Sequence, residues 1–217
     1  MDYGNMVGDS FAYAKEAVVG KWNQWVMLII ATILLGIPLA GYSMKVLRGE
    51  KPAPEVADWG TLFIDGIKYI IVALIFAIPI IIVYAIIMVV GIGAMMTGDA
   101  GAVAGLGIML VGMLVILVLA IVIGIFEVIG VVRFARTGSI GEAFNFSAIL
   151  ATIAKIGWVP YIIALVVLGV VGVIFSIIVT ILMMIPILGI LIYLCLIAPW
   201  MLFCTRYICQ LYDSAGA

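Results

Sequence analysis

Residues 106–130 read LGIMLVGMLVILVLAIVIGIFEVIG, and Glu127 is the only charged residue in this stretch. A transmembrane helix needs about 20 consecutive apolar residues to cross a hydrocarbon core about 30 Å thick, and this stretch is long enough. It has to be helical, because a membrane-spanning β-strand is much shorter and alternates apolar with polar side chains. The stretch therefore predicts a membrane protein built from α-helices.

The composition of the whole chain agrees with that prediction. Of its 217 residues, 68% are hydrophobic and only 10% are charged, and the mean hydropathy is +1.45. A soluble domain typically carries about 25% charged residues, because its surface faces water. Too few polar residues remain for a separate soluble domain, so we expect residues 1–217 to form a single integral membrane domain.

The apolar runs predict an all-α, polytopic transmembrane helical bundle of about five spans. Gly36 and Pro38 interrupt the first run. We expect this run to cross the membrane with a kink, and a re-entrant hairpin is the alternative. A tight turn at Ile185-Pro186-Ile187 precedes the last span. The expected spans are residues 22–41, 69–90, 106–130 and 158–184, and a fifth that ends near Arg206.

Two amphipathic helices are expected to lie in the membrane interface. Residues 10–21 form the first, with Asp9 or Ser10 capping its start. Ser139 and Glu142 have the spacing of a capping box, which predicts that the second helix begins there.

Lysine and arginine set the expected orientation, because they concentrate in cytoplasmic loops. Most of them fall on one side of the predicted spans, which predicts a multi-pass protein of the cell membrane with its basic loops in the cytoplasm. The N-terminus is then outside if the first segment crosses, and inside if that segment is re-entrant. The net charge of −1 gives no basic field that would attract nucleic acid.

A parallel internal repeat is also expected. In each unit a membrane segment is followed by a basic turn containing glycine, an interfacial helix and another span. The two units cover about residues 22–95 and 106–184.

The chain contains no histidine. A Ser-His-Asp triad, a histidine-ligated zinc ion and a histidine-ligated haem therefore cannot be built from it. Cys195, Cys204 and Cys209 are rotated around a helix away from one another, so we interpret them as packing residues. We predict a protein that is not an enzyme, with no catalytic residue, no metal site and no cofactor.

Glu127 is the only acid inside a predicted span, and intramembrane carboxylates are often functional. A proton- or cation-coupled pathway would need such a group. Glu127 lies a turn or two from the end of its span, however, where Arg133, Arg136 or Lys68 could neutralise it. A structural ion pair or snorkelling to the interface is therefore the other interpretation.

Basic residues beside the spans are candidates for binding anionic lipid headgroups, and they serve equally well as topology determinants. Glycines in and beside the spans let helices approach closely in lipid, either within one chain or between copies. The headgroup candidates are Lys45, Arg48, Lys51, Arg133 and Arg136, and the helix-packing candidates are Gly101, Gly105, Gly112, Gly169 and Gly172.

One polar segment is distinctive: Gly41-Tyr42, then Arg48-Gly49-Glu50, then Pro54, then Asp58-Trp59-Gly60-Thr61-Leu62-Phe63-Ile64-Asp65-Gly66-Ile67-Lys68. Over residues 41–68 the chain resembles domain of unknown function 4013, a family of archaeal and bacterial membrane proteins. The resemblance implies a polytopic membrane protein and carries over no activity or ligand.

Within this segment, Asp58 is placed to cap a helix that begins at Trp59, and Asp65 and Lys68 are spaced to pair at i and i+3. The functional interpretation is that these three charged residues form an ion or partner site on the cytoplasmic side.

Two functions remain from the sequence. We expect a non-enzymatic membrane protein that packs or assembles through its helices, surrounded by lipid, as a homo-oligomer or as a subunit of a membrane complex. The alternative is a small transporter or channel for an ion or small solute, which would use Glu127 and the region of Asp58 and Asp65.

Overall fold

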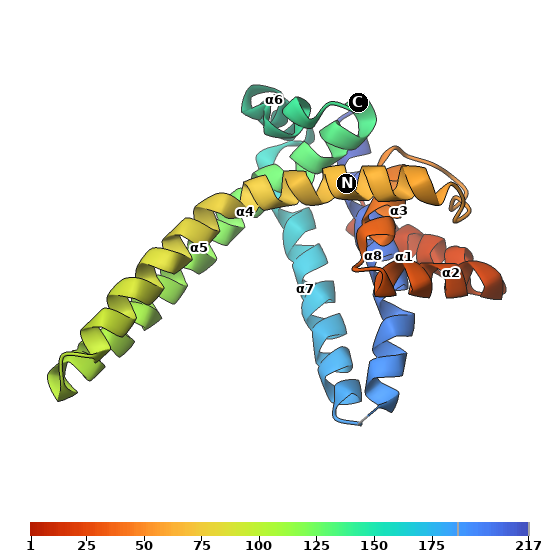
Figure 1. Ribbon diagram of the computed structural model, residues 1–217. Coiled ribbons are helices and arrows are strands. Elements are labelled where there is room, and N and C mark those ends of the chain that lie inside the picture. Colours follow the sequence, from red (N-terminus) through yellow and green to blue (C-terminus); the bar gives the residue numbers. More distant parts are fainter. Residues whose placement is uncertain (186, 217) are drawn as a thin grey trace. The chain divides into compact units, whose positions relative to one another are not determined.

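The computed structural model describes residues 1–185 and 187–216, and every regular element in them is a helix (Figure 1). The all-α prediction is confirmed. Pro186, in the turn expected before the last span, lies outside the described residues. The elements are α1 (Tyr3–Val18), α2 (Trp22–Ile33), α3 (Ile37–Leu47), α4 (Trp59–Met95), α5 (Asp99–Thr137), the 3₁₀ helix η1 (Ile140–Phe144), α6 (Phe146–Ile156), α7 (Trp158–Met183) and α8 (Leu188–Asp213).

Four helices of the described chain, α4, α5, α7 and α8, are long and apolar enough to cross a membrane. Even the shorter two have 26 residues, which corresponds to about 39 Å at about 1.5 Å per residue. Five spans are not confirmed, because the first apolar run forms the two short helices α2 and α3.

The break between α2 and α3 reverses the chain. Leu35 and Gly36 both have left-handed backbone conformations, with φ of 58° and 69°, and Pro38 follows in the first turn of α3. The side-chain amide of Gln24, near the start of α2, donates a hydrogen bond of 3.3 Å to the hydroxyl of Tyr42 in α3. A single straight helix would hold these residues about 27 Å apart, so α2 and α3 fold back on each other.

The described chain packs as two compact units. The first contains Met1–Ile70 and the chain from Val128 onward. Its core lies between α1, α2, α3 and α8, which contact one another, and includes Tyr13, Leu28, Tyr42, Leu62 and Leu202. In this unit α7 and α8 also lie side by side, and the rings of Phe175 and Trp200 stack 4.2 Å apart between them.

The second unit, Ile71–Glu127, is a hairpin of the C-terminal part of α4 and the N-terminal part of α5 (Figure 1). Glycines bring the two helices together. A Cβ at Gly105 would collide with the backbone of Gly91 and the side chain of Met95, and a Cβ at Gly112 would collide with the side chain of Ile87. Close helix approach through small residues is the usual packing mode in lipid.

Two helix starts differ from the expected ones. α1 begins at Tyr3, because the carboxylate of Asp2 accepts the backbone N–H of Asn5 at 3.0 Å. α6 begins at Phe146 and is capped by Asn145, whose side chain accepts the N–H of Ala148 at 3.2 Å. The expected capping box fails because the side chain of Glu142 pairs with an arginine instead.

The internal repeat is not confirmed. In the first proposed copy, the expected interfacial segment is continuous with the following span as one helix, α4. In the second, Gly157 has φ of 93° and separates α6 from α7. The two copies therefore do not share one structure.

Candidate functional site

Each of the four arginines of the chain forms an ion pair with one carboxylate, and all four pairs lie within the first unit. We call these residues the arginine network: Arg48–Asp65, Arg133–Glu142, Arg136–Asp213 and Arg206–Asp9. The chain is poor in charge, so this concentration of paired charges is its most distinctive polar feature and our candidate site.

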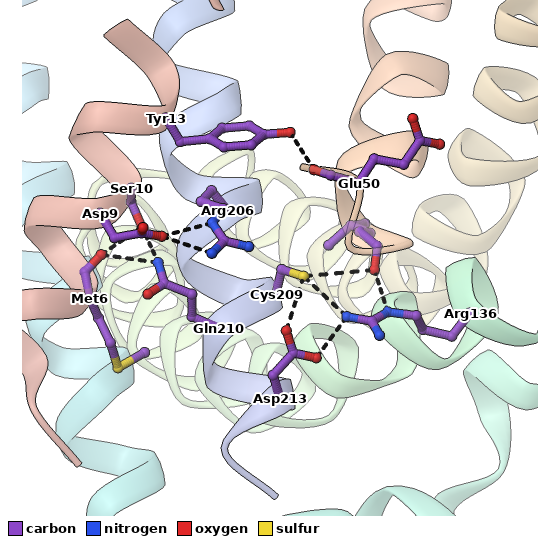
Figure 2. A network of polar contacts seen from close by, with 11 residues as sticks. Met6, Asp9, Ser10, Tyr13, Glu50, Arg136, Arg206, Cys209, Gln210 and Asp213 are labelled. Atoms are coloured by element: carbon purple, nitrogen blue, oxygen red, sulfur yellow. Dashed lines mark hydrogen bonds and ion pairs between the residues drawn. The ribbon is translucent and has the colours of Figure 1, made fainter. Parts of the chain in front are cut away.

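Arg206 joins the two ends of the chain (Figure 2). Its side chain is 4% exposed, and its guanidinium donates to the carboxylate of Asp9 at 2.9 Å from Nε. The guanidinium carbon lies 5.5 Å from the ring centre of Tyr13. One helical turn further, the side-chain amide of Gln210 donates to the hydroxyl of Ser10 at 2.8 Å. These contacts fix α1 along the C-terminal part of α8.

Arg136 connects the end of α5 with α3 and α8 (Figure 2). Its Nε donates to the backbone oxygen of Leu47 at 2.8 Å, and one terminal nitrogen donates to Asp213 at 2.7 Å and to the sulfur of Cys209 at 3.2 Å. Gly49 leaves room for the guanidinium, since a Cβ there would lie 3.2 Å from it, and φ at Gly49 is 91°.

The distinctive segment at residues 41–68 forms a tight crossing of α3 and α4. A Cβ at Gly41 would collide with the backbone of Leu62, and a Cβ at Gly66 would collide with the backbone of Ile37, so the two helices touch through bare backbone. Arg48 then spans from the end of α3 to Asp65 on α4, with 2.6 Å between the charged atoms.

The loop that leads from α3 to α4 is tied to the same core. The fully buried Tyr42 donates its hydroxyl hydrogen to the backbone oxygen of Pro54 at 2.6 Å. Tyr13 of α1 donates to the backbone oxygen of Glu50 at 3.0 Å (Figure 2). Most of the distinctive residues therefore have an identifiable structural task.

Residues 25–184, most of the chain, match a protein family described as "Protein of unknown function (DUF4013)". The chain belongs to the DUF4013 family. The match includes the α3–α4 crossing, the α4–α5 hairpin and α7, and it ends before α8. No curated protein and no solved structure matches the chain.

In this DUF4013 protein, Arg133 pairs with Glu142 at the periphery of the network. Arg133 and the side-chain amide of Asn145 both donate hydrogen bonds to the Glu142 carboxylate. Because these donors stabilise the ionised form, the pKa of Glu142 is lowered from its usual value.

The structure separates the headgroup candidates into two groups. Arg48, Arg133 and Arg136 are held by carboxylates of the same chain. Lys51 is exposed and Lys45 is half-buried, and neither forms an ion pair in the part of the chain that the structure describes.

The residues of the expected ion or partner site at Asp58, Asp65 and Lys68 also differ in whether they form an ion pair. Asp65 pairs with Arg48, whereas its expected partner Lys68 is exposed. Asp58 precedes α4 in a left-handed conformation, with φ of 56°, and its backbone oxygen accepts the N–H of Leu62 at 3.0 Å. The structure thus brings Asp65 into the arginine network and leaves Lys68 on the surface.

Glu127 is half-buried in α5. Two of the basic residues expected to neutralise it, Arg133 and Arg136, have other carboxylates as partners. Among the described residues no ion pair to Glu127 is found.

The glycine candidates also differ from one another. Gly101, Gly105 and Gly112 each face atoms of the same hairpin so closely that a Cβ would collide. A Cβ at Gly172 would touch the ring of Trp200 at 3.7 Å, an ordinary contact, and a Cβ at Gly169 would meet nothing within 4 Å.

Sequence reasoning missed the partners that complete the network, namely Asp9, Glu142, Arg206, Gln210 and Asp213. One signal was available. In a chain that is only 10% charged, leaving a charge beside an apolar helix unpaired costs free energy. A carboxylate near each arginine was therefore to be expected. Which carboxylate it takes depends on contacts between segments distant in sequence.

Proposed function

We propose that this DUF4013 protein is a non-enzymatic membrane protein that assembles through its α4–α5 hairpin, with a second copy or as a subunit of a larger complex. The observation that carries the proposal is an apolar groove of about 700 Å³ along that hairpin. Its lining includes Val83, Ile87, Ala104, Gly107 and Val111.

Gly107 supports contact with another helix. It lines the groove, yet a Cβ placed there would meet nothing within 4 Å, so this glycine is not needed for packing within the hairpin. Small residues at open positions are what helix association in lipid requires, because backbones then approach closely. The arginine network adds support, since its charged groups serve contacts inside the chain.

The proposal includes a topology with four spans and with both termini in the cytoplasm. α1 is bound to the C-terminal part of α8 by Asp9–Arg206 and Ser10–Gln210, which favours an even number of crossings. The arginines gather in the same unit as both termini, and arginine-rich flanks favour the cytoplasmic side.

The test compares Gly107→Leu with Gly124→Leu in the purified, lipid-reconstituted chain. Both glycines lie in α5, and at both a Cβ would meet nothing within 4 Å, so either variant should fold. Only Gly107 lines the groove. We expect the native chain and Gly124→Leu to be oligomeric by mass photometry in nanodiscs and Gly107→Leu to be monomeric. A native chain that is monomeric, or a Gly107→Leu oligomer, would contradict assembly with a second copy through this groove.

Transport remains the second candidate, because Glu127 is a half-buried carboxylate inside a long apolar helix, and two of its expected partners, Arg133 and Arg136, pair with other carboxylates. A coupled transporter requires a group that can gain and lose a proton or cation. Glu127→Gln should then abolish a proton or cation flux in liposomes. If the native chain gives no flux above that of empty liposomes, this candidate fails.

A further inference from the structure

We propose that α2 and α3 form a re-entrant hairpin that enters a single leaflet of the bilayer, where acyl chains cover the outward face of α2. The hairpin has the wrong size for a crossing. Its helices have 12 and 11 residues, about 18 Å and 16 Å of length against a hydrocarbon core of about 30 Å.

The outward face of α2 is an apolar stripe. Trp22, Val26, Ile30 and Ile33 recur at helical spacing and are between 40% and 70% exposed, while Leu28, between them in sequence, is fully buried in the core of the first unit. Water is a poor solvent for such a face. The four residues of this stripe also include no glycine or alanine through which another helix could approach closely, in contrast to the α4–α5 groove with its open Gly107.

The tip of the hairpin gives an independent indication. Leu35 is 87% exposed and has a left-handed backbone with φ of 58°. A leucine in that conformation costs roughly 1–2 kcal/mol relative to glycine. In water, an exposed leucine side chain would not offset this cost. In hydrocarbon the side chain is favourably solvated, so a leucine at this strained position is explained by a tip that lies in lipid.

A hydrogen bond places α2 against the middle of a span. Pro199 has no N–H, so the backbone oxygen of Cys195, four residues earlier in α8, loses its usual helical donor. The indole N–H of Trp25 donates to that oxygen at 3.0 Å. Cys195 lies about 16 Å along α8 from Arg206 and about 10 Å from Leu188, at about 1.5 Å per residue.

This position identifies the occupant. Because Trp25 holds α2 against the apolar part of α8, the stripe lies at the level of that span, where Leu188, Ile190 and Leu191 are also exposed. Val26, Ile30 and Ile33 carry no polar atom that could select a protein partner, so a stripe at this level fits the acyl chains of one leaflet.

The first experiment tests the topology in oriented proteoliposomes. Lys21→Cys and Lys51→Cys place thiols at exposed positions before α2 and after α3, and the native chain with its own three cysteines is the blank. A membrane-impermeant thiol reagent should label both variants from the same side. Labelling from opposite sides would mean that the segment crosses, and would overturn the proposal.

The second experiment identifies what covers the hairpin. A bimane label at Leu35→Cys or Ile33→Cys, both highly exposed positions, should lose fluorescence in bilayers whose acyl chains are brominated and should be insensitive to iodide in the buffer. The same label at the buried Leu28 should respond to neither quencher. Quenching by iodide would indicate water, and a lack of quenching at both exposed positions would indicate a protein partner. Either result would refute the lipid assignment.

Discussion

At the residue scale, the arginines of the network differ in burial. The side chain of Arg206 is 4% exposed and its partner Asp9 is 47% exposed, whereas Arg136 is 28% exposed and its partner Asp213 is 42% exposed. Removing one partner of a buried pair leaves an unpaired charge in a poor solvent, while exposed pairs contribute little. The two pairs should therefore respond differently to the same substitution.

Asp9→Ala should destabilise the protein by about 2–3 kcal/mol, because the buried Arg206 loses its carboxylate. Asp213→Ala is the matched control and should cost about 1 kcal/mol or less, since water reaches this pair and Arg136 keeps its bond to the backbone oxygen of Leu47. The measurement is equilibrium unfolding in mixed micelles with increasing dodecyl sulfate. Equal losses for the two variants would argue against a special role of the buried arginine.

Glu142 predicts a dependence of stability on pH. Its folded-state pKa lies below the usual value, so its pairing with Arg133 stabilises the fold above the ordinary glutamate pKa of about 4.3 and is lost as the pH falls through the lower folded-state value. Glu142→Gln should lower the melting temperature at neutral pH and should make it less sensitive to acid below about pH 4. If the melting temperatures of the native chain and of Glu142→Gln fell by the same amount as the pH is lowered, this prediction would be wrong.

Neither pair was predictable as a pair. Asp9 and Arg206 are separated by 197 residues. A hydropathy pattern describes local segments and does not predict contacts between distant ones. The sequence did indicate that Arg133 and Arg136 flank a span, but their partners Glu142 and Asp213 follow from how the ends of α5 and α8 pack in the first unit.

At the scale of elements, the α3–α4 crossing depends on two glycines. Gly41→Ala would push a methyl group into the backbone of Leu62, and overpacking of this kind typically costs about 1–3 kcal/mol. Gly60→Ala, in the first turn of α4, meets nothing within 4 Å and should be neutral or slightly stabilising, because alanine favours a helix. Dodecyl sulfate unfolding of both variants checks this, and a tolerated Gly41→Ala would show that the helices can separate freely.

The contact of Trp25 with the free carbonyl of Cys195 can be tested by a double-mutant cycle. Trp25→Phe removes the donor and should cost about 1 kcal/mol or more. In the Pro199→Ala background, the alanine N–H can serve the same oxygen, so Trp25→Phe should cost less there. If the cost is the same in both backgrounds, the indole N–H does not compensate for the proline.

The long helices were predictable and the short ones were only partly so. Residues 106–130 lie inside α5 because an apolar run of that length can satisfy its backbone in lipid only as a helix. Gly36 and Pro38 marked the break in the first run. The reversal there also needed Leu35 in a left-handed conformation, which no local propensity favours.

At the scale of the whole molecule, the pairing of α1 with α8 predicts where the ends of the chain lie. Short epitope tags at the N-terminus and at the C-terminus should both be accessible to antibody from the same side of sealed vesicles, because Asp9–Arg206 and Ser10–Gln210 hold those segments together. A tag inserted in the turn between α4 and α5, next to Gly98, should be accessible from the other side. Tags at the two ends on opposite sides would require an odd number of crossings.

The bond between Asp9 and Arg206 also has a consequence for biosynthesis. Arg206 is translated 197 residues after Asp9. The carboxylate of Asp9 on α1 therefore has no arginine partner until α4, α5 and α7 have been translated and α8 has left the insertion machinery. A nascent chain stalled before α8 would lack the contacts of Asp9 with Arg206 and of Ser10 with Gln210, so α8 has to be translated before α1 is fixed in place.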